Sequence, residues 1–184
     1  MSLKTGGSIF IFSSPSGAGK TTLVKLVSKR KNFITSISHT TRKPRSNEKT
    51  GKDYHFVSNK HFKNLIKKNQ FLEHAKVFDN YYGTSKKPVI KNLSNGINVL
   101  FDIDWQGSEQ LSKFKELNLV KVFILPPSKE ELEKRLIARN QDDKEAIKRR
   151  MLAYSKDISH KNDYDYVLIN DNVENCFNEL LTSP

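Results

Sequence analysis

A short glycine-containing segment, residues 14–21, directly follows the apolar run Ile9–Phe12 and reads Ser-Pro-Ser-Gly-Ala-Gly-Lys-Thr. Its glycines let successive backbone N–H groups point at one anion, its lysine adds a mobile positive charge, and its threonine hydroxyl can ligate Mg²⁺. Ser14 replaces the glycine that usually opens this pattern, and a small residue still permits the turn. The segment predicts a site for the phosphates of ATP or GTP, whereas a simple strand-to-helix turn is the less favoured alternative. The residues expected to bind the nucleotide are Ser16, Gly17, Ala18, Gly19, Lys20, Thr21 and Thr22.

A second group of cationic and phenolic side chains begins in the loop Thr41–Arg45. Arg42 and Arg45 are three residues apart, and the proline between them stiffens the loop. Two guanidinium forks accompanied by tyrosine hydroxyls suit a second phosphate that is not transferred. Either arginine alone could instead form a surface ion pair. The residues nearby that could complete such a pocket are Glu48, Tyr54 and Tyr82.

The composition bounds the class of protein. A chain of 184 residues is long enough to bury a core and favours a single domain. The net charge of +12 invites a nucleic-acid hypothesis, but the lysines are dispersed without interleaved aromatic residues, so a solvated surface is favoured over polynucleotide binding. The single cysteine, Cys176, excludes an internal disulfide, and the histidines lack the spacing of a zinc site. Because we find neither a signal peptide nor a bilayer-spanning run, we expect a cytoplasmic protein that binds no membrane.

Short apolar runs alternate with segments of helical periodicity. The expected strands are Ile9–Ser13, Phe33–Ser38, Ile97–Phe101, Val120–Leu125 and Tyr166–Ile169. The expected helices are Lys20–Arg30, Ser58–Asn69, Trp105–Glu116, Ser128–Ala138 and Asp143–Ser159, with N-caps at Ser58 and Ser128. This alternation predicts an α/β fold with a central parallel sheet flanked by helices. The region from His39 to about Lys86 interrupts the alternation with a basic stretch and aromatic β-like segments, and we expect it to be an inserted substrate lobe.

Five further segments have distinctive sequences and follow one another along the chain. They are Ser36–Arg45, Asp53–Phe56, Phe71–Ala75, Asn80–Thr84 and Asp102–Gly107. Together with the phosphate loop and the segment Ile124–Ser128, they resemble the guanylate kinase family, whose members phosphorylate GMP with ATP. The resemblance implies a P-loop nucleoside-monophosphate kinase fold in one domain, residues 1–184. Its implied parts are a core of residues 1–38, 87–134 and 151–184, a GMP-binding lobe of residues 39–86 and a lid of residues 135–150.

The resemblance also implies the partners and the acceptor site. We expect ATP as phosphoryl donor, Mg²⁺ as cofactor, GMP as acceptor with dGMP as a second substrate, and a monomer or homodimer. The residues expected to hold the GMP phosphate are Arg42, Arg45, Tyr54 and Tyr82, with Glu48 beside them. The residues expected to recognise guanine are Ser38, Glu73 and Thr84. A carboxylate at Glu73 suits the adjacent N1–H and 2-amino donors of guanine, and adenine cannot match it.

The donor side requires cations around the migrating phosphoryl group. Asp102 ends an apolar strand, where a carboxylate positions Mg²⁺ together with Thr21, and Asp104 is expected on the GMP side. The attacking phosphate is already anionic, so Lys20, Arg42 and the lid arginines are expected to act by positioning and charge neutralisation. The lid arginines are Arg135, Arg139 and Arg150, and Asn170 is expected near the adenine. For Arg135, an exposed ion pair with Glu131 is nearly as plausible.

Three asparagines depart from the family pattern. Asn47 and Asn140 stand where the family has glycine, and Asn172 replaces an acid. Asparagine tolerates left-handed backbone, so we expect the turns at Asn47 and Asn140 to be preserved. The main competing hypothesis is a non-catalytic domain that binds phosphopeptides in the old GMP pocket. Such scaffolds typically lack the intact phosphate loop or the lid arginines, and this chain retains both.

Overall fold

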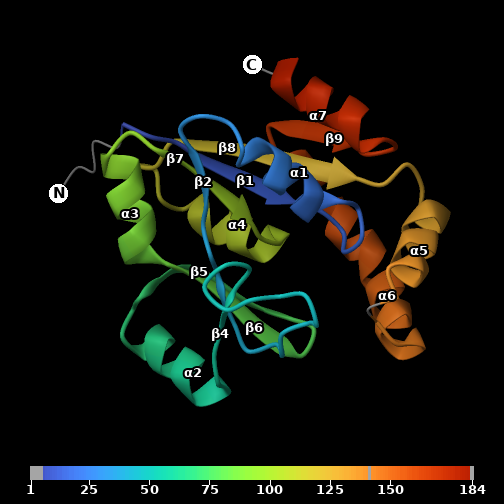
Figure 1. Cartoon of the computed structure of the whole chain (residues 1–184), viewed down its shortest axis with the longest axis horizontal. Helices are drawn as coiled ribbons and strands as arrows, with labels where there is room; N and C mark the ends of the chain where they lie inside the picture. Colours follow the sequence, from blue (N-terminus) through green and yellow to red (C-terminus); the bar gives the residue numbers. More distant parts are fainter. Residues whose placement is uncertain (1–5, 141, 183–184) are drawn as a thin grey trace.

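A five-stranded parallel sheet forms the centre of the computed structural model, which describes residues 6–140 and 142–182 (Figure 1). In sheet order the strands are β2 (Phe33–Thr35), β7 (Asn98–Asp102), β1 (Ile9–Ser13), β8 (Leu119–Leu125) and β9 (Tyr166–Ile169). Phe12 of β1 pairs with Asp102 on one side and with Val122 on the other. Because neighbouring strands run parallel, their carboxyl ends share one edge, and the phosphate loop therefore begins beside Asp102.

Alternate residues of each strand supply the two layers of the core. Ile11, Val99 and Phe101 belong to one buried cluster, whereas Phe12 and Leu100 belong to the other. Helices α3 (Lys86–Ser94) and α4 (Trp105–Leu111) contribute buried residues to the first cluster. Helices α1 (Lys20–Val27), α5 (Lys129–Ala138) and α7 (Val173–Thr182) contribute to the second. A parallel sheet needs such cover on both faces, since each strand is apolar on both sides.

Two appendages flank this core. Residues after β2 form a smaller sheet in the order β4 (His55–Phe56), β3 (His39–Thr40), β6 (Asn80–Ser85) and β5 (Phe71–Val77), with helix α2 (Asn59–Lys67) beside it. The fully buried Phe62 of α2 packs against Phe71 and stacks on Tyr81. On another side, α5 and α6 (Lys144–Ser159) form a helix pair that stands beside the core (Figure 1). The cavity described below lies among the core, the small sheet and α6.

The predicted parallel sheet flanked by helices is confirmed, with several boundaries corrected. The helix expected over Trp105–Glu116 ends at Leu111, where the Ser112 hydroxyl donates to the carbonyl of Ser108 and competes with the helical pattern. The strand expected over Phe33–Ser38 ends at Thr35 because the following residues leave for the small sheet. Helices α3 and α7 were not expected. Pro88 is tolerated in α3 because it occupies the first turn, where N–H groups have no helical partner. No helix of the described residues combines the length and apolar character needed to cross a membrane.

Candidate functional site

The phosphate loop has the backbone that its glycines predict. Gly17 and Gly19 have φ values of 102° and 94°, which side chains disfavour. A Cβ atom on Gly19 would lie 2.1 Å from Nδ2 of Asn170, the atom that donates a 2.8 Å hydrogen bond to the carbonyl of Ala18. Asn170 is only 1% exposed and is not among the residues that line the cavity. It was expected near the adenine, but it supports the phosphate loop from the buried side.

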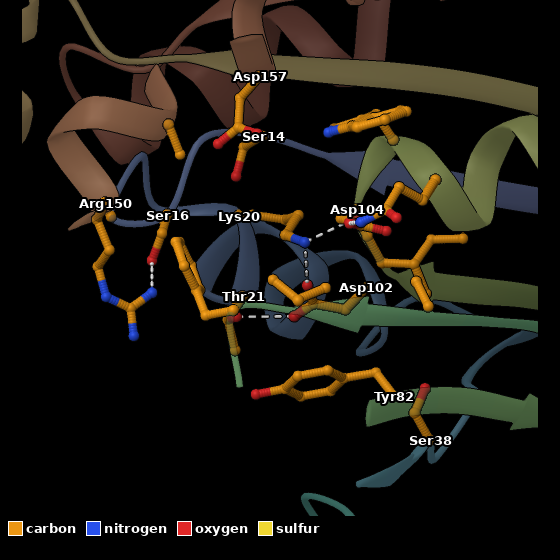
Figure 2. Close-up of a pocket in the computed structure, with 18 of the residues that line it drawn as sticks. Ser14, Ser16, Lys20, Thr21, Ser38, Tyr82, Asp102, Asp104, Arg150 and Asp157 are labelled. Carbon is orange, nitrogen blue, oxygen red and sulfur yellow. Dashed lines mark hydrogen bonds and ion pairs between the residues drawn. The ribbon is translucent and has the colours of Figure 1, made fainter. Parts of the chain in front are cut away.

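Lys20 and Thr21, at the start of α1, converge on the end of β7 (Figure 2). The Lys20 ammonium lies 2.8 Å from Oδ1 of Asp102 and donates to the carbonyl of Ile103 at 2.8 Å. The Thr21 hydroxyl donates to Oδ2 of Asp102 at 2.7 Å. One carboxylate thus holds both the cation and the hydroxyl that a nucleotide's phosphates would meet. The parallel pairing of β1 with β7 brings these residues together although they are far apart in sequence.

A cavity of about 650 Å³ joins the two anion sites expected from the sequence. The expected site residues that line it are Ser16, Gly17, Gly19, Lys20, Thr21, Thr22, Ser38, Arg42, Arg45, Tyr54, Glu73, Tyr82, Asp102, Asp104, Arg135, Arg139 and Arg150. Four expected residues, Ala18, Glu48, Thr84 and Asn170, lie behind this lining. The cavity therefore gathers the phosphate loop, the arginine loop and the helix pair around one space. Its size suits small-molecule ligands.

The arginine loop is fixed by one carboxylate. Glu48 accepts from Nη1 and Nη2 of Arg42 at 2.9 and 2.8 Å, and from the backbone N–H of Arg45 at 2.8 Å. The guanidinium of Arg42 also lies 5.4 Å from the centre of the Tyr54 ring. Burial lowers the pKa of Arg42, but the Glu48 carboxylate outweighs it, and the net pKa is raised. Glu48 was expected beside the substrate phosphate, and its contacts instead make it a support for Arg42 and Arg45.

A buried acid, Glu73, lines the cavity. Glu73 of β5 is 3% exposed, and its Oε1 atom has no hydrogen-bond partner within the described residues. Burial raises the pKa of Glu73 to about 7, opposed by a hydrogen bond from Thr84. The hydroxyls of Ser38 and Thr84 are paired at 3.0 Å beside it. A Cβ atom on Gly107 would lie 2.6 Å from Oε2 of Glu73, so glycine lets α4 approach the acid closely. The carboxyl group is therefore positioned to accept hydrogen bonds from a ligand.

The helix pair places two arginines at the opposite wall. Arg139 caps the carboxyl end of α5, and Arg150 of α6 donates from Nη1 to the hydroxyl of Ser16 in the phosphate loop (Figure 2). Both guanidiniums bind Asp142. Arg135 pairs with Glu131 at 2.9 Å and donates to the carbonyl of Asn170, so the ion pair weighed in the sequence is present while the side chain also lines the cavity.

The backbone conformation shows what two of the asparagines that replace family glycines, Asn47 and Asn140, require. Asn140 has a φ of 47°, so it takes the left-handed conformation that asparagine tolerates. Asn47 is not among the described residues with positive φ, and its turn needs no such conformation. The neighbouring Gln141, within the expected lid, lies outside the described residues, as do residues 1–5 and 183–184 of the expected core.

The sequence analysis missed several residues that line the cavity, among them Asp157, Trp105 and Phe78. Asp157 of α6 faces the cavity (Figure 2), where burial and the nearby Asp104 raise its pKa to about 6. Trp105 lines the cavity and stacks on His160 with ring centres 3.8 Å apart. Phe78 packs under the guanidinium of Arg150. Asp157 could have been found, because residues seven apart share a helix face and Arg150 lies seven residues before it.

Comparisons with known proteins place these features in a family. The model of the guanylate kinase family matches residues 7–183. The guanylate kinase of Wolbachia pipientis is 49% identical over 98% of this chain and 90% of that protein, and the one from Rickettsia bellii is 50% identical over 97% and 94%. Among solved structures, guanylate kinase from Anaplasma phagocytophilum matches with a TM-score of 0.79 and 35% identity, covering 98% of this chain and 86% of that one.

Proposed function

Because the chain belongs to the guanylate kinase family, we propose that it transfers the terminal phosphoryl group of ATP to GMP, giving ADP and GDP, in the cavity described above. It is an ATP-dependent nucleoside-monophosphate kinase. One observation supports the assignment of residues more than any other: Arg42 and Arg45 line the same cavity as Gly17, Gly19 and Lys20. A donor phosphate on the glycine loop and an acceptor phosphate on the arginines would therefore share one space.

On the donor side, the backbone N–H groups of the phosphate loop and the Lys20 ammonium bind the phosphates of ATP. Arg135, Arg139 and Arg150 add positive charge from the helix pair and exclude water that would hydrolyse ATP. The residues assigned to ATP are Ser16, Gly17, Ala18, Gly19, Lys20, Thr21, Thr22, Arg135, Arg139 and Arg150. Asn170 acts indirectly in this proposal, since it supports the loop through the carbonyl of Ala18.

On the acceptor side, Arg42 and Arg45 with the hydroxyls of Tyr54 and Tyr82 hold the GMP phosphate. Ionised Glu73 accepts hydrogen bonds from N1–H and the 2-amino group of guanine, and Ser38 and Thr84 complete base recognition. The buried, unpartnered oxygen of Glu73 supports this role, because buried polar atoms usually have a hydrogen-bond partner and guanine would supply one. Asp104 lies on the same side of the cavity. We propose dGMP as a second substrate.

The residues at the end of β7 fit a Mg²⁺ site. The Thr21 hydroxyl and the Asp102 carboxylate are adjacent oxygen donors, which this hard cation prefers, and Mg²⁺ usually takes few protein ligands besides phosphates. No group of three or more acidic, histidine or cysteine side chains within the described residues forms an all-protein metal cage. When bound, the cation would neutralise charge on the phosphates of ATP. Thr21 and Asp102 would hold it.

The transfer needs no general base. An oxygen of the dianionic GMP phosphate attacks the γ-phosphorus of ATP, while the bond from that phosphorus to the bridging oxygen breaks and ADP leaves with the electron pair. Lys20, Arg42, Arg139 and Arg150 stabilise the charge on the migrating group and hold donor and acceptor in line. The chain's contribution is therefore geometric and electrostatic.

Phosphopeptide binding without catalysis is the alternative that the sequence left open, and no comparison favours it. The intact phosphate loop and the three lid arginines, Arg135, Arg139 and Arg150, argue for the enzyme. We infer that polynucleotides are not substrates, because the lysines are dispersed along the chain without interleaved aromatic residues. The cytoplasmic location and the monomeric or homodimeric state stay predictions.

A panel assay tests the activity. The chain is given Mg·ATP with GMP, dGMP, AMP, CMP, UMP or dTMP, and ADP release is measured. We expect turnover with the two guanine nucleotides alone. Lys20→Ala is expected to abolish transfer, while GMP affinity measured by calorimetry stays within about threefold, because Lys20 neutralises the donor phosphates. Turnover with AMP at a comparable rate, or no turnover together with retained phosphopeptide binding, would refute the proposal.

A further inference from the structure

Asp142, in the turn between α5 and α6, is bound by two arginines from different helices. Its Oδ2 atom accepts from Nη2 of Arg139, and its Oδ1 atom accepts from Nη2 of Arg150 at 3.0 Å. The side chain of Asp142 is only 8% exposed. Two long cationic side chains are thereby fastened to a single carboxylate at the wall of the cavity.

The local backbone explains how one acid reaches both arginines. Arg139 is the C-cap of α5, and Asn140 then reverses the chain in the left-handed conformation. Asp143 caps the start of α6 by accepting from the N–H of Ala146 at 2.7 Å. Asp142, between the reversal and the cap, is free of helical bonding and turns back toward Arg139 and Arg150. The adjacent acids thus have different tasks: Asp143 stabilises a helix, whereas Asp142 binds the arginines.

The contacts with Asp142 use one nitrogen of each guanidinium. Each arginine meets Asp142 through Nη2, and the Nε atoms of both are buried without a partner within the described residues. Nη1 of Arg150 reaches the hydroxyl of Ser16 in the phosphate loop. The Arg150 guanidinium is also held over the Phe78 ring, 5.2 Å from its centre. Asp142 therefore fixes where the guanidiniums lie without consuming the donors that an anion would use.

The charges of Asp142, Arg139 and Arg150 also favour the binding of an anion. Burial lowers the pKa of Arg150, and repulsion from Arg139 lowers it further although Asp142 opposes the shift. Burial raises the pKa of Asp142, but its bonds with Arg139 and Arg150 outweigh burial and keep the acid ionised. With the carboxylate ionised, the trio still carries one net positive charge. Two arginines can approach each other here only because the acid lies between them.

We propose that Asp142 is a positioning residue for phosphoryl transfer, holding Arg139 and Arg150 together beside the phosphate loop so that ATP meets both guanidiniums already in place. This rests on the role proposed above for the two arginines in binding the phosphates of ATP. The competing possibility is that Asp142 occupies the arginines and obstructs ATP, and the two ideas predict opposite changes when its charge is removed.

The test compares Asp142→Asn with Asp143→Asn, a matched control that removes the same charge one residue away and keeps a capping side chain. In steady-state assays with GMP and Mg·ATP, we expect Asp142→Asn to lower kcat/KM for ATP about 10- to 100-fold, the effect of losing charged hydrogen bonds. KM for GMP should stay within about twofold. Asp143→Asn should match the unchanged protein, and Asp142→Glu, which restores the carboxylate, should recover most of the loss.

Calorimetry of Mg·ATP binding without GMP and melting temperatures separate the remaining explanations. Weaker ATP binding by Asp142→Asn at an unchanged melting temperature supports the proposal. Tighter ATP binding by Asp142→Asn, or unchanged kinetics, overturns it. The proposal is also overturned if the fall in kcat/KM for ATP accompanies a lowered melting temperature and Asp142→Glu does not restore the activity. Asp142 would then have only a structural role. If the wild-type protein failed to phosphorylate GMP, the proposed function would be refuted instead.

Discussion

Two pairs of arginines face the cavity, and each pair shares one carboxylate. In the small sheet's loop, Glu48 binds Arg42 through both of its oxygens and reaches Arg45 mainly through the backbone. Between the helices, Asp142 divides its two oxygens between Arg139 and Arg150. The first arrangement gives one guanidinium a bidentate carboxylate partner. The second arrangement spreads a single negative charge over two guanidiniums.

The difference appears in the pKa values. Against the effect of burial, Glu48 leaves the pKa of Arg42 raised, whereas burial and a neighbouring arginine leave that of Arg150 lowered. Arg42 thus has a carboxylate partner that binds it through both oxygens, while Arg139 and Arg150 each bind one oxygen of Asp142. The difference teaches that one carboxylate can either pair with a single guanidinium or hold two guanidiniums together.

Removing one arginine from each pair is expected to produce the largest and most distinct effects. Arg139→Ala should lower kcat about 10²- to 10³-fold with little change in GMP affinity, because it removes charge stabilisation of the transferred group. Arg42→Ala should mainly raise KM for GMP, about 10- to 100-fold, because it removes a charged hydrogen-bond partner of the bound phosphate. Steady-state kinetics with each substrate varied checks both. If the two variants changed the same constant equally, the division into donor and acceptor pairs would be wrong.

The next largest effect is expected from pH, which should change the affinity for GMP through Glu73. Glu73 has a pKa of about 7 in the free protein, and guanine donors bind only its ionised form, so GMP binding releases a proton. GMP affinity should therefore rise about tenfold per pH unit from pH 5 to 7 and then level off. Calorimetry across this range measures it. Glu73→Gln provides the control, because it retains the titration of the GMP phosphate alone. Equal pH profiles for both proteins would contradict the assignment.

The smallest effect is expected from neutralising the acid of the arginine loop. Glu48→Gln should lower the free energy of unfolding by about 1–3 kcal/mol and raise KM for GMP about tenfold, because Arg42 loses its bidentate partner. ATP affinity should not change. Urea unfolding and kinetics check these values. Asp53→Asn is a suitable control, since Asp53 lies in the same loop region but binds only the N–H of Lys49. A rise in KM for ATP would show that the two arginine pairs are not independent.

The core was predictable because its signals are local. Strands Ile9–Ser13 and Tyr166–Ile169 were predicted to the residue, since apolar runs of that length between polar turns have few other interpretations. Helix α3 was missed because Lys86 and Lys87 look like solvated surface and Pro88 looks like a breaker. Its buried face rests on only Val89 and Leu93, too few to show a period. Tertiary packing decides such elements.

The candidate site was predictable by residue type but not by contact. Glycine spacing and the resemblance to a family led to the lining residues, because their chemistry is visible in the sequence. The supporting roles of Glu48, Asp142 and Asn170 were not visible, since each depends on which backbone the fold brings near. Asn170 and Ala18, for example, are 152 positions apart. Sequence reasoning therefore identifies what meets the ligand more readily than what holds those residues.

The contact between Asn170 and the glycine loop has a consequence for how the protein is made. Asn170 follows β9, which pairs with β8, so the 152 positions that separate Ala18 from Asn170 must be synthesised before the loop acquires this support. β1 and α1 can form early in synthesis, yet the phosphate loop lacks the support of Asn170 until β9 has joined the sheet. The first motif of the chain to be translated is thus among the last to mature.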